Sequence, residues 1–470
     1  MQTRQIEFKP MRIEGAMKVS VHLDAQGNVA GAHAHVLEFR GFEAFMRGRH
    51  VTKAALLTSR ICGVCPIPHH LASLKAVEAG LGIEIPETAR LLRELMLAAA
   101  HVADHILHLT VLAGPDILLA DMPPEQRGLP ALIERYPGVV KDVLAARKAA
   151  QTIVSALGTQ GIHPTTGVPG GITQGLSEPA RAHLLEQARK LKEKILELGG
   201  VLVPQIEQSI RANDGLGRLS TCFMGLVKGD ALELYDGLAR VVDPQGCTLA
   251  EFQPAQYLEH VGEKVLDRSY AKAAYLCSSE PAGEMVRVGP IAQINVAKSA
   301  PTEHANTFLQ DLKGRFGGVV QETLALNHAR YVALVYAIER VEQLLTDERV
   351  TKGDTLTPVQ YRAGEGVGIV EAPRGLLIHH FRWDDQGLIT MANIIAPTTV
   401  NSYAIDSSLE AVAQRSISAG KVDEQQLEHE LGLTVRAYDP CLSCATHVYA
   451  PDADEHWVEI IDAQGYKRWI

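Results

Sequence analysis

The sequence predicts a mainly α-helical fold of the α+β class, in which one large helical bundle carries small β-hairpins at its edges. Three observations predict it. Long segments repeat apolar residues at three-four spacing, short apolar segments flank three similar turns, and no Ser-, Gly- or Pro-rich linker divides the chain. The 470 residues can bury a large core, and we expect residues 1–470 to form a single domain.

Three segments carry the helical pattern. Residues 87–112 place apolar side chains on one face, at Leu92, Leu95, Ala99, Val102, Ile106 and Leu109. Ser177 is the expected N-cap of a helix toward Asn213, with a weak point at Gly199–Gly200. A third apolar stripe comprises Tyr331, Leu334, Ile338, Val341 and Leu345. Residues 214–302 show no regular pattern.

The N-terminal region, residues 1–45, is expected to form a β-hairpin. Residues 17–23 and 29–36 flank the turn Asp24-Ala-Gln-Gly27. Similar turns at 384–387 and 462–465 also lie between apolar segments. We interpret them as shared turn chemistry rather than as an internal repeat.

Composition argues against several classes of protein. Because 45 cationic and 55 anionic residues give a net charge of −10, a nucleic-acid partner is not expected. We see neither a signal segment nor an uninterrupted apolar run long enough to span a bilayer, so we expect a cytoplasmic protein. Three isolated cysteines, Cys222, Cys247 and Cys277, are expected to be small buried apolar residues rather than ligands.

Two C-x-x-C motifs near opposite ends of the chain are the main functional feature. Each aims two sulfurs at one point, and thiolates are ligands that soft metals select. The motifs are Cys62-x-x-Cys65, followed by His69, and Cys441-x-x-Cys444, followed by His447. On the cysteines alone, a structural zinc site and a catalytic metal are equally open, although zinc-binding pairs usually lie much closer in sequence.

The residues around both motifs favour a catalytic metal. The motifs read Arg60-Ile-Cys62-Gly-Val-Cys65-Pro-Ile-Pro-His69 and Asp439-Pro-Cys441-Leu-Ser-Cys444-Ala-Thr-His447. Together they resemble the signatures of the large subunit of [NiFe] hydrogenases, and further matches occur at 12–15, 39–43, 163–171, 371–375 and 397–401. This resemblance spans the chain. It implies the fold of that large subunit, together with the reversible heterolytic oxidation of H2 to protons and electrons.

The resemblance also implies a ligand set. Cys62 and Cys441 would be terminal nickel ligands, while Cys65 and Cys444 would bridge nickel to an iron that carries one carbon monoxide and two cyanides. Splitting H2 heterolytically requires a Lewis-acidic metal and a nearby base, and a thiolate sulfur can serve as that base.

Glu14 matches the carboxylate that relays the proton from Cys441 in this family. The alternative is an ordinary surface carboxylate at the start of a strand. One departure lies beside it, because Ala16 stands where the family usually has histidine. That change touches no expected metal ligand.

Further matches surround the expected metal. Arg374 matches a guanidinium at the open coordination site, where a structural salt bridge is its alternative role. Asp439 matches a carboxylate paired with that arginine, and Asp116 is a candidate for a second one. Thr398 and the backbone near Pro373 match groups that donate hydrogen bonds to the cyanides.

A second metal site is also implied. Glu43, His447 and the backbone carbonyl of Ile394 match ligands of a magnesium or iron ion, while His69 is expected to orient a cysteine sulfur. Three further histidines share one face of the helix over 87–112, at His101, His105 and His108. They could bind a metal, but we favour hydrogen-bonded helix histidines because no carboxylate lies at ligand spacing.

Residues 448–470 resemble the C-terminal maturation peptide that a dedicated protease removes after His447 once nickel has been inserted. H2-sensing relatives generally lack it, so it favours a catalytic enzyme. Too few other cysteines remain for an iron–sulfur cluster, and electrons are therefore expected to leave through an iron–sulfur small subunit. The residues of these motifs most resemble those of cytoplasmic bidirectional enzymes, which transfer electrons to NAD(P) or a deazaflavin through flavin-bearing subunits.

Three alternatives remain. An H2-sensing regulatory hydrogenase would retain every ligand and would differ in the tail and in turnover. A non-catalytic scaffold stapled by metal would need neither Glu14 nor Arg374. The quinone-site subunit of respiratory complex I shares the ancestry but lacks the ligand cysteines.

Overall fold

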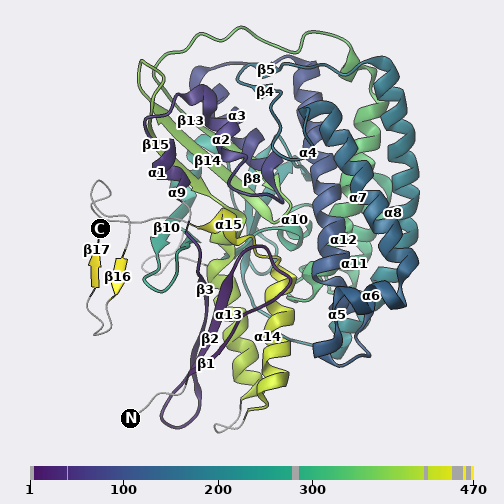
Figure 1. The fold of residues 1–470 in the computed structure, drawn as a ribbon, viewed down its shortest axis with the longest axis vertical. Coiled ribbons are helices and arrows are strands. Elements are labelled where there is room, and N and C mark those ends of the chain that lie inside the picture. Colours follow the sequence, from purple (N-terminus) through teal and green to yellow (C-terminus); the bar gives the residue numbers. More distant parts are fainter. Residues whose placement is uncertain are drawn as a thin grey trace.

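A helical bundle forms one side of the molecule. The computed structural model describes residues 5–39, 41–277, 285–417, 422–446, 459–461 and 467–469. Four long helices lie side by side (Figure 1): α4 (Glu87–Leu107), α7 (Pro137–Gly158), α8 (Glu178–Ala212) and α12 (Ala325–Thr346). Together with the small sheets described below, they confirm the predicted mainly helical fold.

The expected helices over 87–112 and 177–213 are both present, with two differences in detail. The first ends as α4 at Leu107 and continues as a π-helical turn over His108–Leu112. The second is unbroken at Gly199, where a Cβ atom would lie 1.8 Å from the Tyr331 hydroxyl oxygen. The glycine therefore allows α8 to approach α12 closely, at a cost in helix propensity of about 1 kcal/mol.

One helical segment, Glu87–Leu112, is long and apolar enough to cross a membrane by length and composition. We did not expect such a segment from the sequence. It packs against α7 and α12, and 72% of its most apolar window is buried inside the protein. Its apolar character is therefore that of a core helix.

The remaining helices are short or lie outside the bundle. They are α1 (Phe42–Met46), α2 (Ala54–Thr58), α3 (Pro66–Leu81), α5 (Gly114–Leu118), α6 (Leu129–Arg135), α9 (Tyr257–His260), α10 (Pro290–Val296), α11 (Glu303–Arg315), α13 (Pro397–Ser416), α14 (Glu424–Tyr438) and α15 (Leu442–Ala445).

Two antiparallel sheets flank the chain segments that carry the cysteines. The N-terminal sheet has the order β1 (Gln5–Phe8), β2 (Met17–Leu23), β3 (Val29–Val36), with the predicted turn at 24–27. The other has the order β13 (Gly364–Ala372), β14 (Gly375–Trp383), β15 (Ile389–Ile395). Gly366 and Gly368 let β13 pack against α3, because a Cβ at either would lie 2.1 Å from a backbone oxygen of that helix.

The region that showed no sequence pattern contains most of the other strands. One sheet joins β6 (Cys222–Lys228), β7 (Ala231–Leu232), β8 (Leu238–Val242), β9 (Thr248–Phe252) and β12 (Val286–Arg287). Three antiparallel pairs complete the strands: β4 (Gly167–Val168) with β5 (Gly171–Ile172), β10 (Val261–Val265) with β11 (Lys272–Leu276), and β16 (Glu459–Ile461) with β17 (Lys467–Trp469). The third predicted turn, at 462–465, lies outside the described residues.

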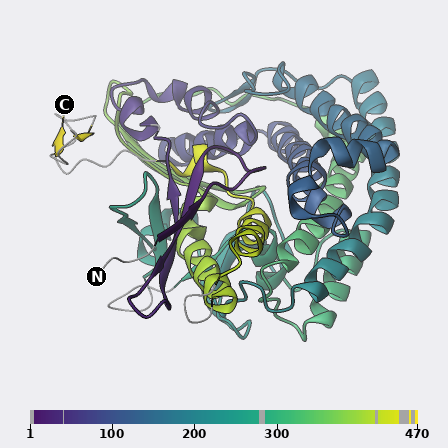
Figure 2. The same cartoon turned by 60° about the horizontal axis from the view of Figure 1, so that its bottom comes forward.

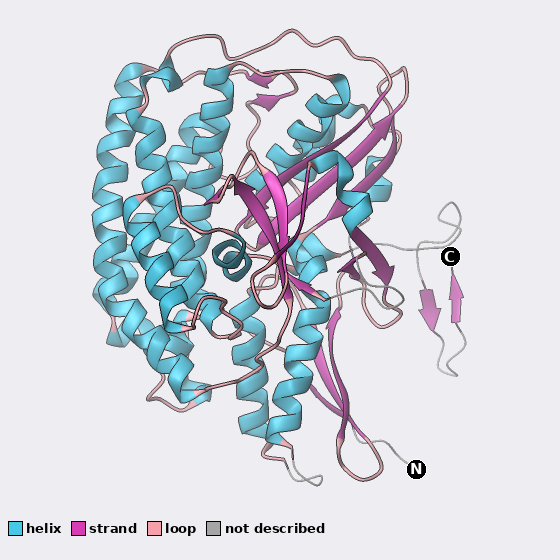
Figure 3. Ribbon diagram, turned by 180° about the vertical axis from the view of Figure 1, so that it is seen from behind, coloured by secondary structure: helices cyan, strands magenta, loops and turns pink. Residues whose placement is uncertain are grey.

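Figures 2 and 3 show the long helices along one side of the molecule and most of the strands on the other. The short helix α15 lies between these parts, close to α13 and to the N-terminal segment that precedes β2 (Figure 1). Of the isolated cysteines, Cys222 is buried, whereas Cys247 and Cys277 are exposed, so the expectation of burial was wrong for those two.

Candidate metal centre

The four cysteines of the two motifs meet at one buried point. Cys65 immediately precedes α3 and Cys441 immediately precedes α15, so the two short motifs meet where these helices begin. All four sulfurs lie within 4.8 Å of one another. The Sγ–Sγ distance is 3.3 Å for Cys62–Cys441, 3.3 Å for Cys65–Cys444 and 2.9 Å for Cys441–Cys444. None of the four forms a disulfide.

This donor set fits a soft or borderline metal. Each cysteine is at most 6% exposed, and the four converging ligand atoms of this group are all sulfurs. Thiolates select metals such as nickel, iron and zinc. The residues present can therefore hold a metal or a small metal cluster.

His69 contacts this cluster from α3. Its Nε2 lies 3.2 Å from Cys444 Sγ, and its Nδ1 lies 3.1 Å from His379 Nε2. His379 in turn meets the Ser73 hydroxyl at 2.8 Å. Burial lowers the pKa of His69 to about 4, so its ring is neutral at pH 7. This chain of contacts fixes the ring against one sulfur.

Arg374 occupies the turn between β13 and β14. Its Nε donates to the Asp439 backbone carbonyl at 2.8 Å, and its two terminal nitrogens contact Asp439 Oδ1 and Asp104 Oδ2, each at 3.0 Å. The guanidinium is 3% exposed. It lines a small cavity together with Cys65, His69, Ala372, Pro373, Leu377, Pro397, Thr398, Cys441 and Cys444.

Asp439 ends α14 in a left-handed conformation, with φ 53°. Its carboxylate also contacts Arg330 at 3.1 Å and His108 at 3.1 Å. Burial alone would raise the pKa of Asp439, but Arg374, His108 and Arg330 lower it overall. For Asp104, burial outweighs the arginines and raises the pKa to about 6.

The second carboxylate at Arg374 is Asp104, on α4, and not Asp116. Asp116 instead contacts Arg12 at 2.8 Å and Arg436 at 2.6 Å. Asp104 was not expected from the sequence, although it lies on α4 only four residues before His108, which also contacts Asp439. Arg330 was not expected either, because it lies inside an ordinary apolar helix and has no local signal.

The helix histidines are hydrogen-bonded, as we favoured. His101 Nδ1 lies 3.2 Å from His105 Nε2, and His105 Nδ1 lies 3.2 Å from an Arg330 nitrogen. His101 Nε2 meets the Glu371 backbone carbonyl at 3.0 Å, and His108 meets Asn327 at 3.1 Å. Among the described residues, the four cysteines are the one group that could hold a metal by the proximity of ligand atoms.

Glu14 lies against the cluster from the segment that precedes β2. Cys441 Sγ donates to Glu14 Oε2 at 3.2 Å. The Ser443 backbone N–H donates to the same oxygen at 3.0 Å, and the Ser443 hydroxyl forms a short hydrogen bond with Oε1. The carboxylate is only partly buried, unlike Asp104 and Asp439. It therefore joins a deeply buried sulfur to a less buried region.

Thr398 lies in the first turn of α13, and its Oγ1 accepts the Cys441 backbone N–H at 2.9 Å. The threonine hydroxyl hydrogen is not used in this bond, so it can be donated to another group. Thr398 also lines the cavity at the cysteines. Pro373 also lines it, and its carbonyl accepts a hydrogen bond from Arg330 at 3.0 Å.

Glu43 and Ile394 are neighbours, because the Ile394 backbone N–H donates to Glu43 Oε1 at 2.8 Å. Lys272 Nζ lies 3.6 Å from Glu43 Oε2 and 3.4 Å from Glu263 Oε1. A small cavity beside them is lined by Phe42, Glu43, Ile61, Ile394, Ser443, Cys444 and Thr446. His447, the third expected ligand, lies outside the described residues.

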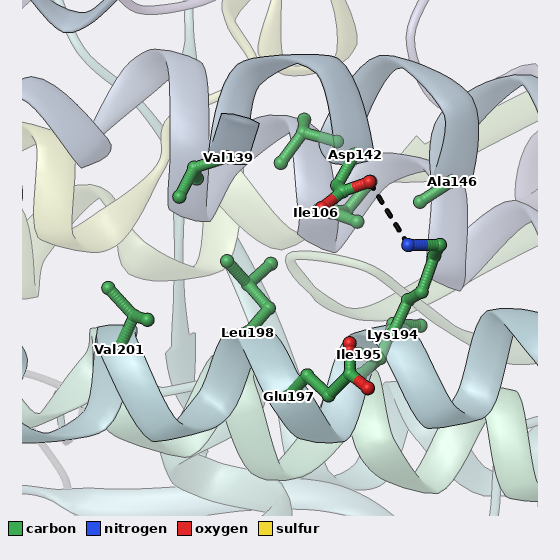
Figure 4. A pocket seen from close by; sticks show the side chains of 10 residues that line it. Ile106, Val139, Asp142, Ala146, Lys194, Ile195, Glu197, Leu198 and Val201 are labelled. Atoms are coloured by element: carbon green, nitrogen blue, oxygen red, sulfur yellow. Dashed lines mark hydrogen bonds and ion pairs between the residues drawn. The ribbon is translucent and has the colours of Figure 1, made fainter. Parts of the chain in front are cut away.

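A larger hollow of about 160 Å³ lies away from the cysteines, between α7 and α8. Figure 4 shows apolar side chains such as Val139 and Leu198 along it, and Lys194 reaching across to Asp142. This ion pair spans 3.1 Å and is half exposed. The hollow contains no soft ligand and is a gap between packed helices.

Comparison with known proteins identifies the family. The nickel-dependent hydrogenase family matches residues 40–119 and 245–447, and a HoxL-like family matches residues 5–39. The corresponding chain of the F420-non-reducing hydrogenase of Methanothermobacter marburgensis is 37% identical over 463 residues, which cover 97% of both chains. The NAD-reducing hydrogenase HoxS subunit beta of Cupriavidus necator is 36% identical, with 95% of each chain covered.

Solved structures agree. A chain of an NAD+-reducing [NiFe]-hydrogenase in the H2-reduced state superposes with a TM-score of 0.90 at 35% identity, over 95% of this chain and 100% of that one. A [NiFeSe] hydrogenase of Desulfovibrio vulgaris Hildenborough gives 0.77 at 22% identity, a likeness of fold. The four-cysteine centre and these relationships lead to one conclusion: this chain belongs to the nickel-dependent hydrogenase family and is the catalytic large subunit of a [NiFe] hydrogenase, an oxidoreductase that acts on H2.

Proposed function

We propose that the four cysteines hold a nickel–iron centre in which Cys62 and Cys441 are terminal nickel ligands and Cys65 and Cys444 bridge to iron. The observation that carries this proposal is the convergence of four buried sulfurs within 4.8 Å. When bound, the centre would supply the Lewis acid at which H2 is split, with one carbon monoxide and two cyanides on iron. Thr398 and Pro373 line the cavity, and the Thr398 hydroxyl and the backbone near Pro373 would donate hydrogen bonds to the cyanides.

The chain's own groups then have distinct tasks. Cys441 Sγ takes up the proton, and Glu14 Oε2 receives it across 3.2 Å. Arg374 holds a fixed positive charge at the cavity, because Asp104 and Asp439 anchor its guanidinium. A fixed cation costs no reorganisation during the reaction. His69 holds Cys444 in orientation.

A second ion would bind at Glu43. Its carboxylate, the Ile394 carbonyl and the His447 side chain are of the donor type that suits magnesium or iron(II). The ammonium of Lys272 lies 3.6 Å from Glu43 Oε2.

Electrons would leave through a partner protein. Of the three cysteines outside the centre, Cys222 is buried and Cys247 and Cys277 are exposed, which is one short of the four thiolates an iron–sulfur cluster uses. We infer an iron–sulfur small subunit, further flavin-bearing subunits and a final acceptor of the NAD(P) or deazaflavin class. The cytoplasm is the location such a complex would have.

Residues 448–470 would be a maturation peptide. A dedicated protease would remove it after His447, once nickel-insertion factors have loaded the site. The domain proposal follows from this: residues 1–447 form the mature unit, with 1–45 as its N-terminal β-hairpin region.

The test is purification of the complex from its native host, followed by metal analysis, infrared spectroscopy and mass spectrometry. We expect nickel, bands in the carbonyl–cyanide stretching region and a chain that ends at His447. H2-dependent reduction of NAD+, NADP+ and a deazaflavin then identifies the acceptor. Zinc alone, without those bands on a fully assembled complex, would contradict the proposal.

A further inference from the structure

A single residue, Ser443, contacts both oxygens of the Glu14 carboxylate. Its backbone N–H donates to Oε2 at 3.0 Å, and its hydroxyl forms a short hydrogen bond with Oε1. Ser443 is 2% exposed and lies in α15, between the ligands Cys441 and Cys444. With Cys441 Sγ, three donors converge on one carboxylate, and two of them belong to this serine.

The backbone holds the two segments in fixed register. Glu14 and Cys441 form an isolated parallel β-bridge, and the Leu442 N–H donates to the Glu14 carbonyl at 3.2 Å. Gly15 has φ 83°, and a Cβ atom there would lie 2.8 Å from Leu442 Cβ. Close approach of the two backbones therefore requires glycine at this position.

This backbone register does not fix the end of the Glu14 side chain. The terminal torsion of a glutamate is broad, and its carboxylate can rotate. Only a contact to each oxygen selects one orientation. The Ser443 hydroxyl is the contact to Oε1, and it leaves Oε2 facing Cys441 Sγ.

We propose that Ser443 is a positioning residue that holds the Glu14 carboxylate in line with Cys441 Sγ. This rests on the proposed function, in which Glu14 receives the proton from that sulfur. The serine forms no covalent bond during the reaction and transfers no electron. It removes rotational freedom from the Glu14 side chain, so the receiving oxygen is in place when the proton leaves sulfur.

The experiment compares Ser443→Ala, Ser443→Thr and Glu14→Gln in the assembled complex, with Ser408→Ala as the matched control. Ser408 is also a buried serine, and its hydroxyl bonds the Gly217 carbonyl and the Tyr438 hydroxyl, each at 2.9 Å. Ser443→Ala should lower kcat about tenfold at unchanged KM for H2 and enlarge the solvent isotope effect. Ser443→Thr should restore both, and Ser408→Ala should change neither.

A second readout does not need the metal. In thermal unfolding of the unprocessed full chain, Ser443→Ala should lower Tm, and a Glu14→Ala background should at least halve that shift, because the two side chains share their hydrogen bond. Equal shifts in both backgrounds would overturn the proposal, as would kcat within twofold of the parent in Ser443→Ala. These outcomes distinguish the role proposed for Glu14 from the role proposed for Ser443. If Glu14→Gln retains full turnover, the role proposed for Glu14 fails. If Glu14→Gln is inactive while Ser443→Ala has normal turnover, only the positioning role of Ser443 fails.

Discussion

The groups around Arg374 and the groups around Glu14 both lie beside the four cysteines but are built differently. Arg374, Arg330, Asp104 and Asp439 come from four separate elements and are all buried, and their charges are paired. Glu14 is partly buried and meets neutral donors, a thiol, a hydroxyl and a backbone N–H. The first set suits a fixed electric field, and the second suits a group that gains and loses a proton.

The strongest test of this contrast is Arg374→Lys. Lysine keeps the positive charge, but it lacks the planar set of N–H donors with which arginine reaches Asp104 and both acceptors of Asp439. H2 oxidation should fall by about 10²–10³-fold while nickel content stays unchanged. Metal analysis and an activity assay with a viologen dye measure the two quantities. If nickel is lost in proportion to activity, Arg374 has a structural role instead.

Asp104→Asn should have an intermediate effect that depends on pH. Burial raises the pKa of Asp104 to about 6, so the parent loses its ion pair with Arg374 as the pH falls below that value. The amide behaves like the protonated acid at every pH. At pH 8 we expect activity to fall about tenfold, and the decline of the parent near pH 6 should be absent from the variant. An unaltered pH profile would show that this carboxyl does not tune Arg374.

Glu371→Gln tests stability instead of turnover. Burial raises the pKa of Glu371 from 4.5 to about 8, while its Oε1 accepts the Leu226 N–H at 2.7 Å. A pKa raised in the folded state stabilises the protein below pH 4.5, and this contribution is lost as the pH rises toward 8. The parent should lose at most about 1.4 kcal/mol per pH unit in that window relative to the glutamine variant. Calorimetry at pH 5, 6, 7 and 8 checks it, and a constant difference would refute it.

Lys194→Gln is the smallest change and serves as a control for charge removal. The ion pair with Asp142 is half exposed on both sides (Figure 4). Such surface pairs contribute at most about 1 kcal/mol. Turnover should be unchanged and Tm should move by no more than about 2 °C. A large loss of activity would mean that a charge change anywhere in the bundle affects the centre, and that the groups around Arg374 and Glu14 have no special influence on it.

The sequence was most informative where chemistry depends on short motifs. The two cysteine motifs predicted that the four cysteines meet, and the family resemblance of segments 12–15 and 371–375 predicted the approach of Glu14 to Cys441 and the Arg374–Asp439 contact. The long helices were also predictable, because their apolar periodicity is strong.

Partners supplied by distant helices were not predictable. Arg330 sits on a helix that is buried on nearly all sides, so no amphipathic pattern marks its contact with Asp439. The misplaced Asp116 has a physical cause in the π-helical turn over His108–Leu112, which changes the face on which later residues lie. The strands over 222–287 are short and partly paired in parallel, so they lack a regular alternation.

The long sequence separation of the cysteines that meet at the metal centre has a consequence for synthesis. The two cysteines that face each other across the cluster, Cys62 and Cys441, are 379 residues apart. At about 5–20 residues per second, a ribosome needs roughly 20 to 75 seconds to add the second after the first. During that interval the first pair of thiols can bind at most half a site. The complete site can form only on a chain that has been translated beyond Cys444, so products truncated before that residue cannot assemble it.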